Sequence, residues 1–170
     1  MNEGTGGEVY FPVFISLEGK RAAVIGAGKI GARRAGVLLS FGCSVTVIAP
    51  EAGEEMRKLL DENEAAGTQK LTWLQEPFSE QLLNDLHEKE PLALVIAAAS
   101  DRRVNHDAGQ AAKRLQIPAN VADCRSECDF YFPGIARKEQ VVVGVCASGA
   151  DHRLARRVTE RMRAALREGE

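Results

Sequence analysis

The sequence predicts an α/β fold, with a doubly wound parallel sheet followed by a β-hairpin and a C-terminal helix. Three observations predict this fold. Short apolar runs alternate with segments of helical periodicity over the first 123 residues, as in parallel sheets covered by helices on both faces. A glycine-rich turn separates the first apolar run from the first helical segment. After Asp123 the alternation stops, and two strand-like segments flank a tight polar turn.

The part of the chain before Asp123 is expected to supply the sheet and its covering helices. β-Branched and other apolar residues fill the strand segments. Ser79 is placed to cap a short helix, and Gly42 is placed to end the first helix. The expected strands are residues 21–25, 44–49, 71–74, 92–99 and 117–122, and the expected helices are residues 29–41, 51–66, 79–86 and 101–115.

The part after Asp123 is expected to form two strands, residues 130–136 and 140–146, joined by a turn at residues 137–139. A last helix is expected over residues 151–166. We therefore divide the chain into domains at residues 1–128 and 129–170.

The first and last expected helices each have an apolar face at helical spacing. Polar residues occupy much of the remaining surface of the last helix, including several arginines. The first face consists of Ile30, Ala35, Leu38 and Leu39, and the second of Leu154, Ala155, Val158, Met162 and Leu166.

Composition indicates a globular protein and excludes several classes. Hydrophobic residues make up 45% and charged residues 27% of the 170 residues, and the net charge is −2. No apolar run approaches the ~20 residues of a membrane span, and no secretion signal is recognised, so we expect a cytoplasmic protein. The basic last helix lacks interleaved aromatic residues, which argues against nucleic-acid binding. The four cysteines are expected to be free thiols, and Cys124 and Cys128 lack a second ligand pair for a metal.

The turn at residues 26–31 has the G-x-G-x-x-G pattern in the context that gives this pattern meaning, after a strand and at the start of a helix. Gly26 permits the tight turn, Gly28 allows the backbone to approach a pyrophosphate, and Gly31 allows close packing of helix and strand. The helix N-terminus offers N–H groups to phosphates. The turn predicts a Rossmann-type dinucleotide-binding domain, and a glycine turn without a ligand is the weaker alternative.

NAD is favoured over NADP as the cofactor. Glu51 follows the second strand, slightly later than the usual acidic residue that holds the ribose 2′-hydroxyl, and no arginine lies there to accept a 2′-phosphate. Alternatively, Glu51 is an acidic residue in the first helical turn, favoured by the helix dipole. The cofactor-binding residues that we assign are Gly26, Gly28, Lys29, Ile30, Gly31, Ala49, Pro50, Glu51, Ala98 and Ser100.

Asp123 lies at the carboxyl end of an expected strand, where doubly wound folds place their ligands. A carboxylate there could accept the proton that leaves when NAD⁺ takes a hydride. Position alone leaves this role and a turn-capping role equally open.

A series of short motifs resembles precorrin-2 dehydrogenase, the dehydrogenase module of siroheme synthases. The similarity runs from about Tyr10 to Leu166, in a fixed order. The motifs are Tyr10–Phe14, Leu17–Lys20, the turn at 26–31 with Ala32–Ala35, Val45–Pro50, Ala97–Asp101, Val104–Asn105, Asn120–Asp123, Cys128–Pro133 and Leu154–Arg156.

The resemblance implies that the chain uses NAD⁺ to oxidise precorrin-2 to sirohydrochlorin, with Asp123 as the functional aspartate. It implies a homodimer, in which the hairpin region provides the dimerisation and substrate contacts. Some members of the family also insert Fe²⁺. Relatives usually carry a second glycine and a proline in the loop that is Cys146–His152 here, so binding of precorrin-2 by this loop stays open. Fuller relatives continue into a helical region that closes over the substrate, and because this sequence ends at Glu170, ferrochelatase activity also stays open.

The tetrapyrrole substrate implied by the resemblance carries eight carboxylates, which arginines bind well. The candidates for substrate binding, taken as a group, are Arg125, Arg137, Lys138, Ser148, Arg153 and Arg156. For the arginines on the last helix, a solvated face with Glu160 as a partner is the alternative, and for most of them it is favoured.

Two other functions are alternatives to a precorrin-2 dehydrogenase. One is a regulatory module that senses NAD(H), but such modules usually end the second strand with an acidic residue, where this chain has Ala49-Pro50. The other is a sirohydrochlorin ferrochelatase without redox activity. Asp123 could serve it as a base, but the intact glycine turn favours a dehydrogenase.

Overall fold

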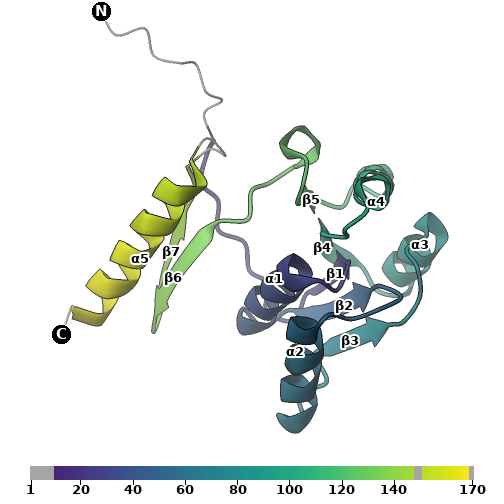
Figure 1. The fold of residues 1–170 in the computed structure, drawn as a ribbon, viewed down its shortest axis with the longest axis horizontal. Coiled ribbons are helices and arrows are strands. Elements are labelled where there is room, and N and C mark those ends of the chain that lie inside the picture. Colours follow the sequence, from purple (N-terminus) through teal and green to yellow (C-terminus); the bar gives the residue numbers. More distant parts are fainter. Residues whose placement is uncertain (1–9, 148–150, 169–170) are drawn as a thin grey trace, which may run out of the picture. The chain divides into compact units, whose positions relative to one another are not determined.

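The computed structural model describes residues 10–147 and 151–168, apart from the side chains of His152 and Glu168 (Figure 1). The chain forms two compact units. One covers Ile15–Phe130, and the other combines residues 10–14 with the chain from Tyr131 onward. The domain boundary at residue 128 remains a prediction, because a compact unit need not fold independently.

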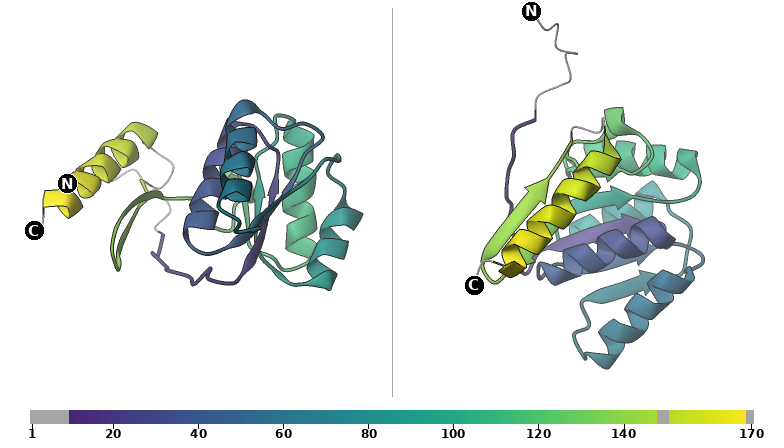
Figure 2. Two further views of the ribbon diagram at one scale, coloured as in Figure 1. Left: turned by 90° about the horizontal axis from the view of Figure 1, so that it is seen from below. Right: turned by 60° about the vertical axis from the view of Figure 1, so that its left-hand side comes forward.

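The first unit is built on a five-stranded sheet with the order β3-β2-β1-β4-β5, and every neighbouring pair is parallel. Helices α1 and α2 cover one face and α3 and α4 the other (Figure 2). The chain order reverses between β1 and β4, which creates the switch point where doubly wound sheets bind ligands. The elements are β1 Arg21–Ile25, α1 Lys29–Ser40, β2 Ser44–Ile48, α2 Glu54–Ala65, β3 Leu71–Leu74, α3 Glu80–Lys89, β4 Leu92–Ala97, α4 Arg102–Arg114 and β5 Ala119–Val121.

The predicted order of strands and helices is confirmed, but several bounds differ, and three of the differences have a clear physical reason. Helix α2 begins at Glu54 instead of residue 51, because Gly53 is its N-cap and the N–H of Gly53 donates to the Ala27 carbonyl at 3.0 Å. Helix α3 continues to Lys89, where His87 and Lys89 in the last turn suit the helix dipole. Strand β5 is shorter than predicted, since Pro118 has no N–H for the ladder.

Alanine and β-branched residues form the core of the first unit. Ala23, Val95 and Ala108 are fully buried, and small side chains on α4 let this helix pack closely on the sheet. The apolar face predicted for α1 was wrong at Ile30. This residue is 47% exposed, because it lies in the first turn of the helix, at the carboxyl ends of the strands.

The second unit consists of the hairpin β6 Gly134–Lys138 and β7 Val141–Val145, together with helix α5 His152–Glu168. The hairpin turn was predicted at residues 137–139 and is found at residues 139–140. Arg137 and Lys138 pair with Val142 and Val141 in the ladder. Glu139 adopts a positive φ of 51°, as short hairpin turns require. Strand β6 begins after Pro133 rather than at residue 130, since proline cannot donate to a ladder.

Helix α5 packs on the hairpin through most of the predicted face, since Ala155, Val158, Met162 and Leu166 are partly buried. Two positions differ from the prediction: Leu154 is 39% exposed, and Thr159 is buried, with 4% exposure. The Thr159 hydroxyl donates to the Ala155 carbonyl at 2.7 Å, so its burial leaves no polar group unpaired. A β-carbon at Gly134 would lie 2.1 Å from Thr159 Oγ1. The absence of a side chain at Gly134 therefore allows the helix to approach the strand.

Within the described ranges, no helix has the length and apolar character needed to cross a membrane.

Candidate functional site

Gly26 and Gly31 in the turn after β1 are required by the fold itself. Gly26 has φ of +100°, and its N–H donates to the Ile48 carbonyl at 2.9 Å. A β-carbon would lie 2.5 Å from the Ala98 carbonyl oxygen at Gly26, and 2.1 Å from the Gly26 carbonyl oxygen at Gly31. Both obstacles are backbone atoms, which cannot move aside as a flexible side chain can. Only glycine fits at either position.

Gly28 differs from these two glycines because it is exposed and has no atom within 4 Å of the position of a β-carbon. It is the N-cap of α1, with no side-chain capping bond. The N–H of Ala32 donates to the Gly28 carbonyl at 2.9 Å. The N–H groups of Lys29, Ile30 and Gly31 come before this first intrahelical bond, so they have no partner within the helix and lie at the positive end of its dipole. This geometry fits a pyrophosphate.

The loop after β2 lies beside the glycine turn. The Ala49 carbonyl accepts a hydrogen bond from Trp73 Nε1 at 2.8 Å, and the Gly53–Ala27 bond joins the loop to the turn. Pro50 and Glu51 are exposed within this loop. The acids in the first turn of α2 are Glu54 and Glu55. The alternative that places Glu51 in the first helical turn is therefore wrong, whereas a contact with the ribose remains a prediction.

Ala98 and Ser100 follow β4 on the other side of the glycine turn. The N–H of Ala98 donates to the Ile25 carbonyl at 2.7 Å, so this segment continues the β1–β4 pairing beyond both strands. Ser100 is exposed at the same edge. All ten predicted cofactor residues thus lie at the carboxyl ends of β1, β2 and β4, and their contact with a cofactor remains a prediction.

Asp123 lies two residues beyond β5, and a buried amide holds its carboxylate. Asn105 Nδ2 donates to Asp123 Oδ2 at 2.9 Å, and Asn105 is 1% exposed. The same side chain accepts from the N–H of Ala99 at 2.8 Å and donates to its carbonyl at 3.0 Å. Asn105 therefore ties the end of β4 to the Asp123 carboxylate. Sequence reasoning placed Asn105 in a family motif but gave it no role.

Two charged side chains complete this cluster. Arg102 lies with Nη1 at 3.6 Å from Asp123 Oδ1, and it forms a shorter hydrogen bond and ion pair with Glu127. Glu127 also contacts His106 Nδ1 at 3.1 Å. Partial burial acts to raise the pKa of Glu127, but the hydrogen bonds from Arg102 and His106 outweigh it and lower this pKa. Arg102 is thus held mainly by Glu127, and the Asp123 side chain keeps 38% exposure.

A second network of hydrogen bonds, centred on the buried Asn120, holds β5 in place. Asn120 accepts from Arg34 Nη1 at 2.5 Å and donates to the Phe130 carbonyl at 2.7 Å. Burial, helped by the nearby Arg33 charge, lowers the pKa of Arg34 to about 10. The Cys128 thiol donates to the Val121 carbonyl at 3.2 Å, and burial raises its pKa. Cys128 therefore anchors the segment that follows Asp123.

The candidate substrate residues are divided between the units. Arg125 lies on a short 3₁₀ helix, Arg125–Glu127, in the unit that contains Asp123. Arg137 is on β6, and Arg153 and Arg156 are on α5. Arg156 pairs with Glu160 at 3.0 Å, which fits the alternative of a solvated helix face. Ser148 lies outside the described residues.

Among the side chains that the structure describes, no three His, Cys, Asp or Glu residues gather in a way that could hold a metal ion. Cys124 Sγ lies 3.4 Å from Ser126 Oγ, while the Cys128 thiol contacts backbone carbonyls.

Comparison with known proteins shows the family of the chain. Residues 13–134 match the family described as "Putative NAD(P)-binding", so the chain belongs to this family of dinucleotide-binding domains. The "Probable multifunctional siroheme biosynthesis protein HemA" of Ruminiclostridium josui is 37% identical over 154 residues, which are 90% of this chain and 28% of the relative. The siroheme synthase of Neisseria meningitidis serogroup C is 35% identical over 157 residues, 92% of this chain and 30% of that protein.

A solved structure titled "SirC, precorrin-2 dehydrogenase" has the same fold. The TM-score is 0.70 at 24% sequence identity, and the match covers 92% of this chain and 71% of that one. The predicted fold class is therefore confirmed, including the hairpin and the C-terminal helix. The chain spans about 30% of the length of the siroheme synthases that it matches.

Proposed function

We propose that this protein catalyses the NAD⁺-dependent dehydrogenation of precorrin-2 to sirohydrochlorin, a step of siroheme biosynthesis. The observation that carries the proposal is the position of the Asp123 carboxylate. It lies at the end of β5, in the sheet whose β1 carries the three-glycine turn. The similarity to siroheme synthases, and the fold shared with a precorrin-2 dehydrogenase, support this assignment.

The turn residues suit a dinucleotide. Open space at Gly28 allows the backbone to approach a pyrophosphate, and the N–H groups of Lys29 and Ile30 are placed to bind its oxygens. Glu51, exposed beside the turn, is our candidate for the ribose hydroxyl. When bound, NAD⁺ supplies the acceptor for a hydride. These features favour NAD⁺, because residues 49–53, which follow β2, contain no arginine or lysine that could bind the 2′-phosphate of NADP.

Asp123 is proposed as the base that accepts the proton lost from precorrin-2. Asn105 fixes one carboxylate oxygen, so the other oxygen is left to face substrate, with Arg102 3.6 Å away. Arg125 is proposed to bind a substrate carboxylate near this base, and Arg137, Ser148, Arg153 and Arg156 are retained as further candidates.

We also propose that the protein is a cytoplasmic homodimer. Phe11, Val13 and Phe14 are 86%, 69% and 71% exposed, and contiguous apolar surface of this kind marks protein interfaces. In the same unit, Tyr10 and Tyr131 pack edge to face with ring centroids 4.6 Å apart, which fixes the start of this segment. The F11S/F14S variant should elute as a monomer in light-scattering chromatography. The I30S variant, changed at an exposed residue of the other unit, should elute with the wild type.

The assignment of Asp123 is tested by separating turnover from cofactor binding. The D123N variant keeps the size and the Asn105 contact but removes the base, so its kcat should fall by at least about 100-fold. Its Kd for NAD⁺, measured by calorimetry, should stay within about twofold of wild type. Unchanged turnover would reject Asp123 as the base. A Kd for NAD⁺ that rises well beyond twofold would show that the substitution damaged the cofactor site instead.

A further inference from the structure

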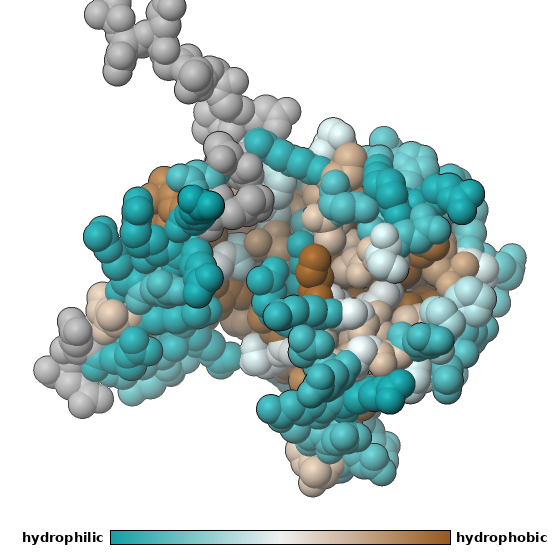
Figure 3. Space-filling view, in the orientation of Figure 1, coloured by the Kyte–Doolittle hydropathy of each residue, from teal (hydrophilic) through white to brown (hydrophobic). Residues whose placement is uncertain are grey.

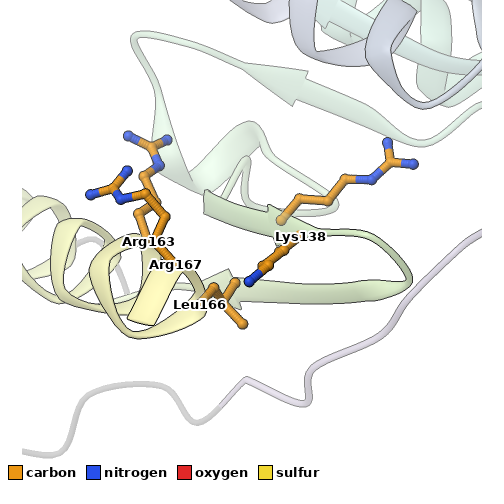
Figure 4. Close-up of a pocket in the computed structure, with 5 residues that line it drawn as sticks. Lys138, Arg163, Leu166 and Arg167 are labelled. Atoms are coloured by element: carbon orange, nitrogen blue, oxygen red, sulfur yellow. The ribbon is translucent and has the colours of Figure 1, made fainter. Parts of the chain in front are cut away.

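A groove in the second unit collects basic side chains from two elements. Lys138 comes from β6, and Arg163, Leu166 and Arg167 come from the end of α5 (Figure 4). Together with Arg137 they line a volume of about 490 Å³, which falls in the range of small-molecule sites, roughly 300–1,000 Å³. We propose that this groove binds a small organic anion that carries at least two carboxylate groups.

The pattern of β6 explains why the groove forms at this end of the strand. Gly134, Ala136 and Lys138 alternate along the strand and share one face. Gly134 and Ala136 are small and lie against α5, with Ala136 1% exposed. Lys138 follows them on the same face. The close packing of helix and strand therefore ends after Ala136. Beyond it, the long basic side chains line an open groove and do not fill it.

Arg163 is oriented by the backbone and not by an acid. Its Nε donates to the Ile135 carbonyl at 2.9 Å. This bond leaves the two terminal nitrogens of the guanidinium as donors for a ligand. Because the bond fixes the plane of the group, less side-chain freedom is lost on binding.

Arg163 and Arg167 are four residues apart on α5, so their like charges lie on the same face and destabilise the helix. Neither pairs with a carboxylate among the side chains that the structure describes. Elsewhere on this helix, Arg156 is compensated by Glu160 at 3.0 Å. A bound dianion would remove the repulsion between Arg163 and Arg167, which is a physical reason for a ligand at this place.

The charge of this region differs from that of the whole chain. Residues 131–170 contain eight Lys and Arg and five Asp and Glu residues, whereas the chain has a net charge of −2. In the view of Figure 3, hydrophilic residues cover most of α5. The excess of positive charge therefore attracts anions to the unit that contains the groove.

The lining favours an organic anion over inorganic phosphate. Planar guanidinium groups match the geometry of both carboxylates and phosphates, but Leu166 offers an apolar contact for the carbon atoms that join two carboxylates. The lining has no aromatic side chain on which a nucleic-acid base could stack. The proposed tetrapyrrole substrate belongs to this class of ligand, but the assignment of the groove does not depend on turnover.

Binding of uroporphyrin I, a tetrapyrrole with eight carboxylates that is not a substrate for dehydrogenation, tests the proposal through its fluorescence anisotropy. The R163Q/R167Q variant should bind it about tenfold or more weakly than the wild type, because two charge-assisted contacts are lost. The R157Q/R161Q variant is the matched control. It removes the same charge at the same spacing on the same helix, outside the groove, and should bind within about twofold of wild type.

Equal weakening in both double variants would show nonspecific attraction and overturn the proposal, as would unchanged binding in R163Q/R167Q. The single variant R167Q, which leaves the bond to Ile135 intact, should weaken binding by several-fold and guards against a folding defect. Tricarballylate should displace the porphyrin at lower concentration than inorganic phosphate at equal ionic strength. Equal displacement by phosphate would reject the preference for carboxylates. Since none of these measurements requires turnover, failure of the proposed dehydrogenase activity would be seen separately.

Discussion

Gly28 is the residue at which folding and binding requirements can be separated. Its β-carbon position is open, whereas those of Gly26 and Gly31 lie within 2.5 Å and 2.1 Å of backbone oxygens. The G28A variant should therefore fold, losing about 1 kcal/mol or less from the changed N-cap. Its methyl group would occupy the space proposed for the pyrophosphate, so the Kd for NAD⁺ should rise at least about tenfold. Calorimetry and thermal unfolding measure the two effects.

The G31A variant is the control for this prediction. Its β-carbon meets the Gly26 carbonyl, so it should lose about 1–3 kcal/mol or more of stability. If G28A bound NAD⁺ like the wild type, the turn would not be the pyrophosphate site.

Glu127 should make stability depend on acid pH. Partial burial acts to raise the pKa of Glu127, but the hydrogen bonds from Arg102 and His106 outweigh it and lower this pKa. The folded state therefore favours the charged form of Glu127. This contribution to stability is present above the ordinary pKa of 4.5 and is lost as the pH falls through the lowered pKa. In urea unfolding, the wild type should therefore lose more stability below pH 4.5 than E127Q.

An equal loss of stability at acid pH in the wild type and in E127Q would contradict this role of Glu127.

Cys43 should make stability depend on alkaline pH. Burial outweighs the effect of Lys70 and raises the pKa of this thiol from 9.0 to about 11. The folded state therefore favours the neutral thiol. Its contribution is fully present below pH 9 and is lost as the pH rises toward 11, up to about 2–3 kcal/mol. Urea unfolding across this range should show the loss in the wild type. The C43A variant, less stable at neutral pH, should show a smaller loss, and an equal loss would reject this assignment.

At the scale of elements, the contact between β6 and α5 depends on Gly134. A β-carbon there would collide with Thr159 Oγ1 at 2.1 Å, so G134A should destabilise the protein by about 1–3 kcal/mol. The double variant G134A/T159A removes the colliding oxygen and should be more stable than expected from the sum of the two single losses. Additive losses in a double-mutant cycle of thermal unfolding would show that the two residues do not interact.

The elements themselves were predictable because each strand and helix follows from a local pattern. Strands β1 and β3 have the predicted bounds, as short apolar runs ended by polar or glycine residues define them. The start of α2 was missed because the Gly53–Ala27 bond joins residues far apart in sequence. The hairpin turn was placed two residues early, because Arg137 and Lys138 are polar but belong to the strand. Polarity alone does not separate a turn from an exposed strand end.

At the scale of the molecule, sequence reasoning identified the glycine turn and Asp123 but not the side chains that hold Asp123. Asn105 is a polar residue within a helix, and its 1% exposure follows from the packing of α4 on the sheet. The link between Arg102 and Glu127 spans 25 residues. The basic groove was missed for a related reason: its cations come from a strand and a helix that no local pattern brings together.

The most direct test of the proposed function is an anaerobic assay of the protein with precorrin-2 and NAD⁺, in which NADH and sirohydrochlorin are followed together. Both products should form at equal rates over many turnovers, and D123N should slow the formation of both at least about 100-fold while still binding NAD⁺. Absence of both products from wild-type protein that binds NAD⁺ would contradict the proposed function and would identify the chain as a dinucleotide-binding module without this activity.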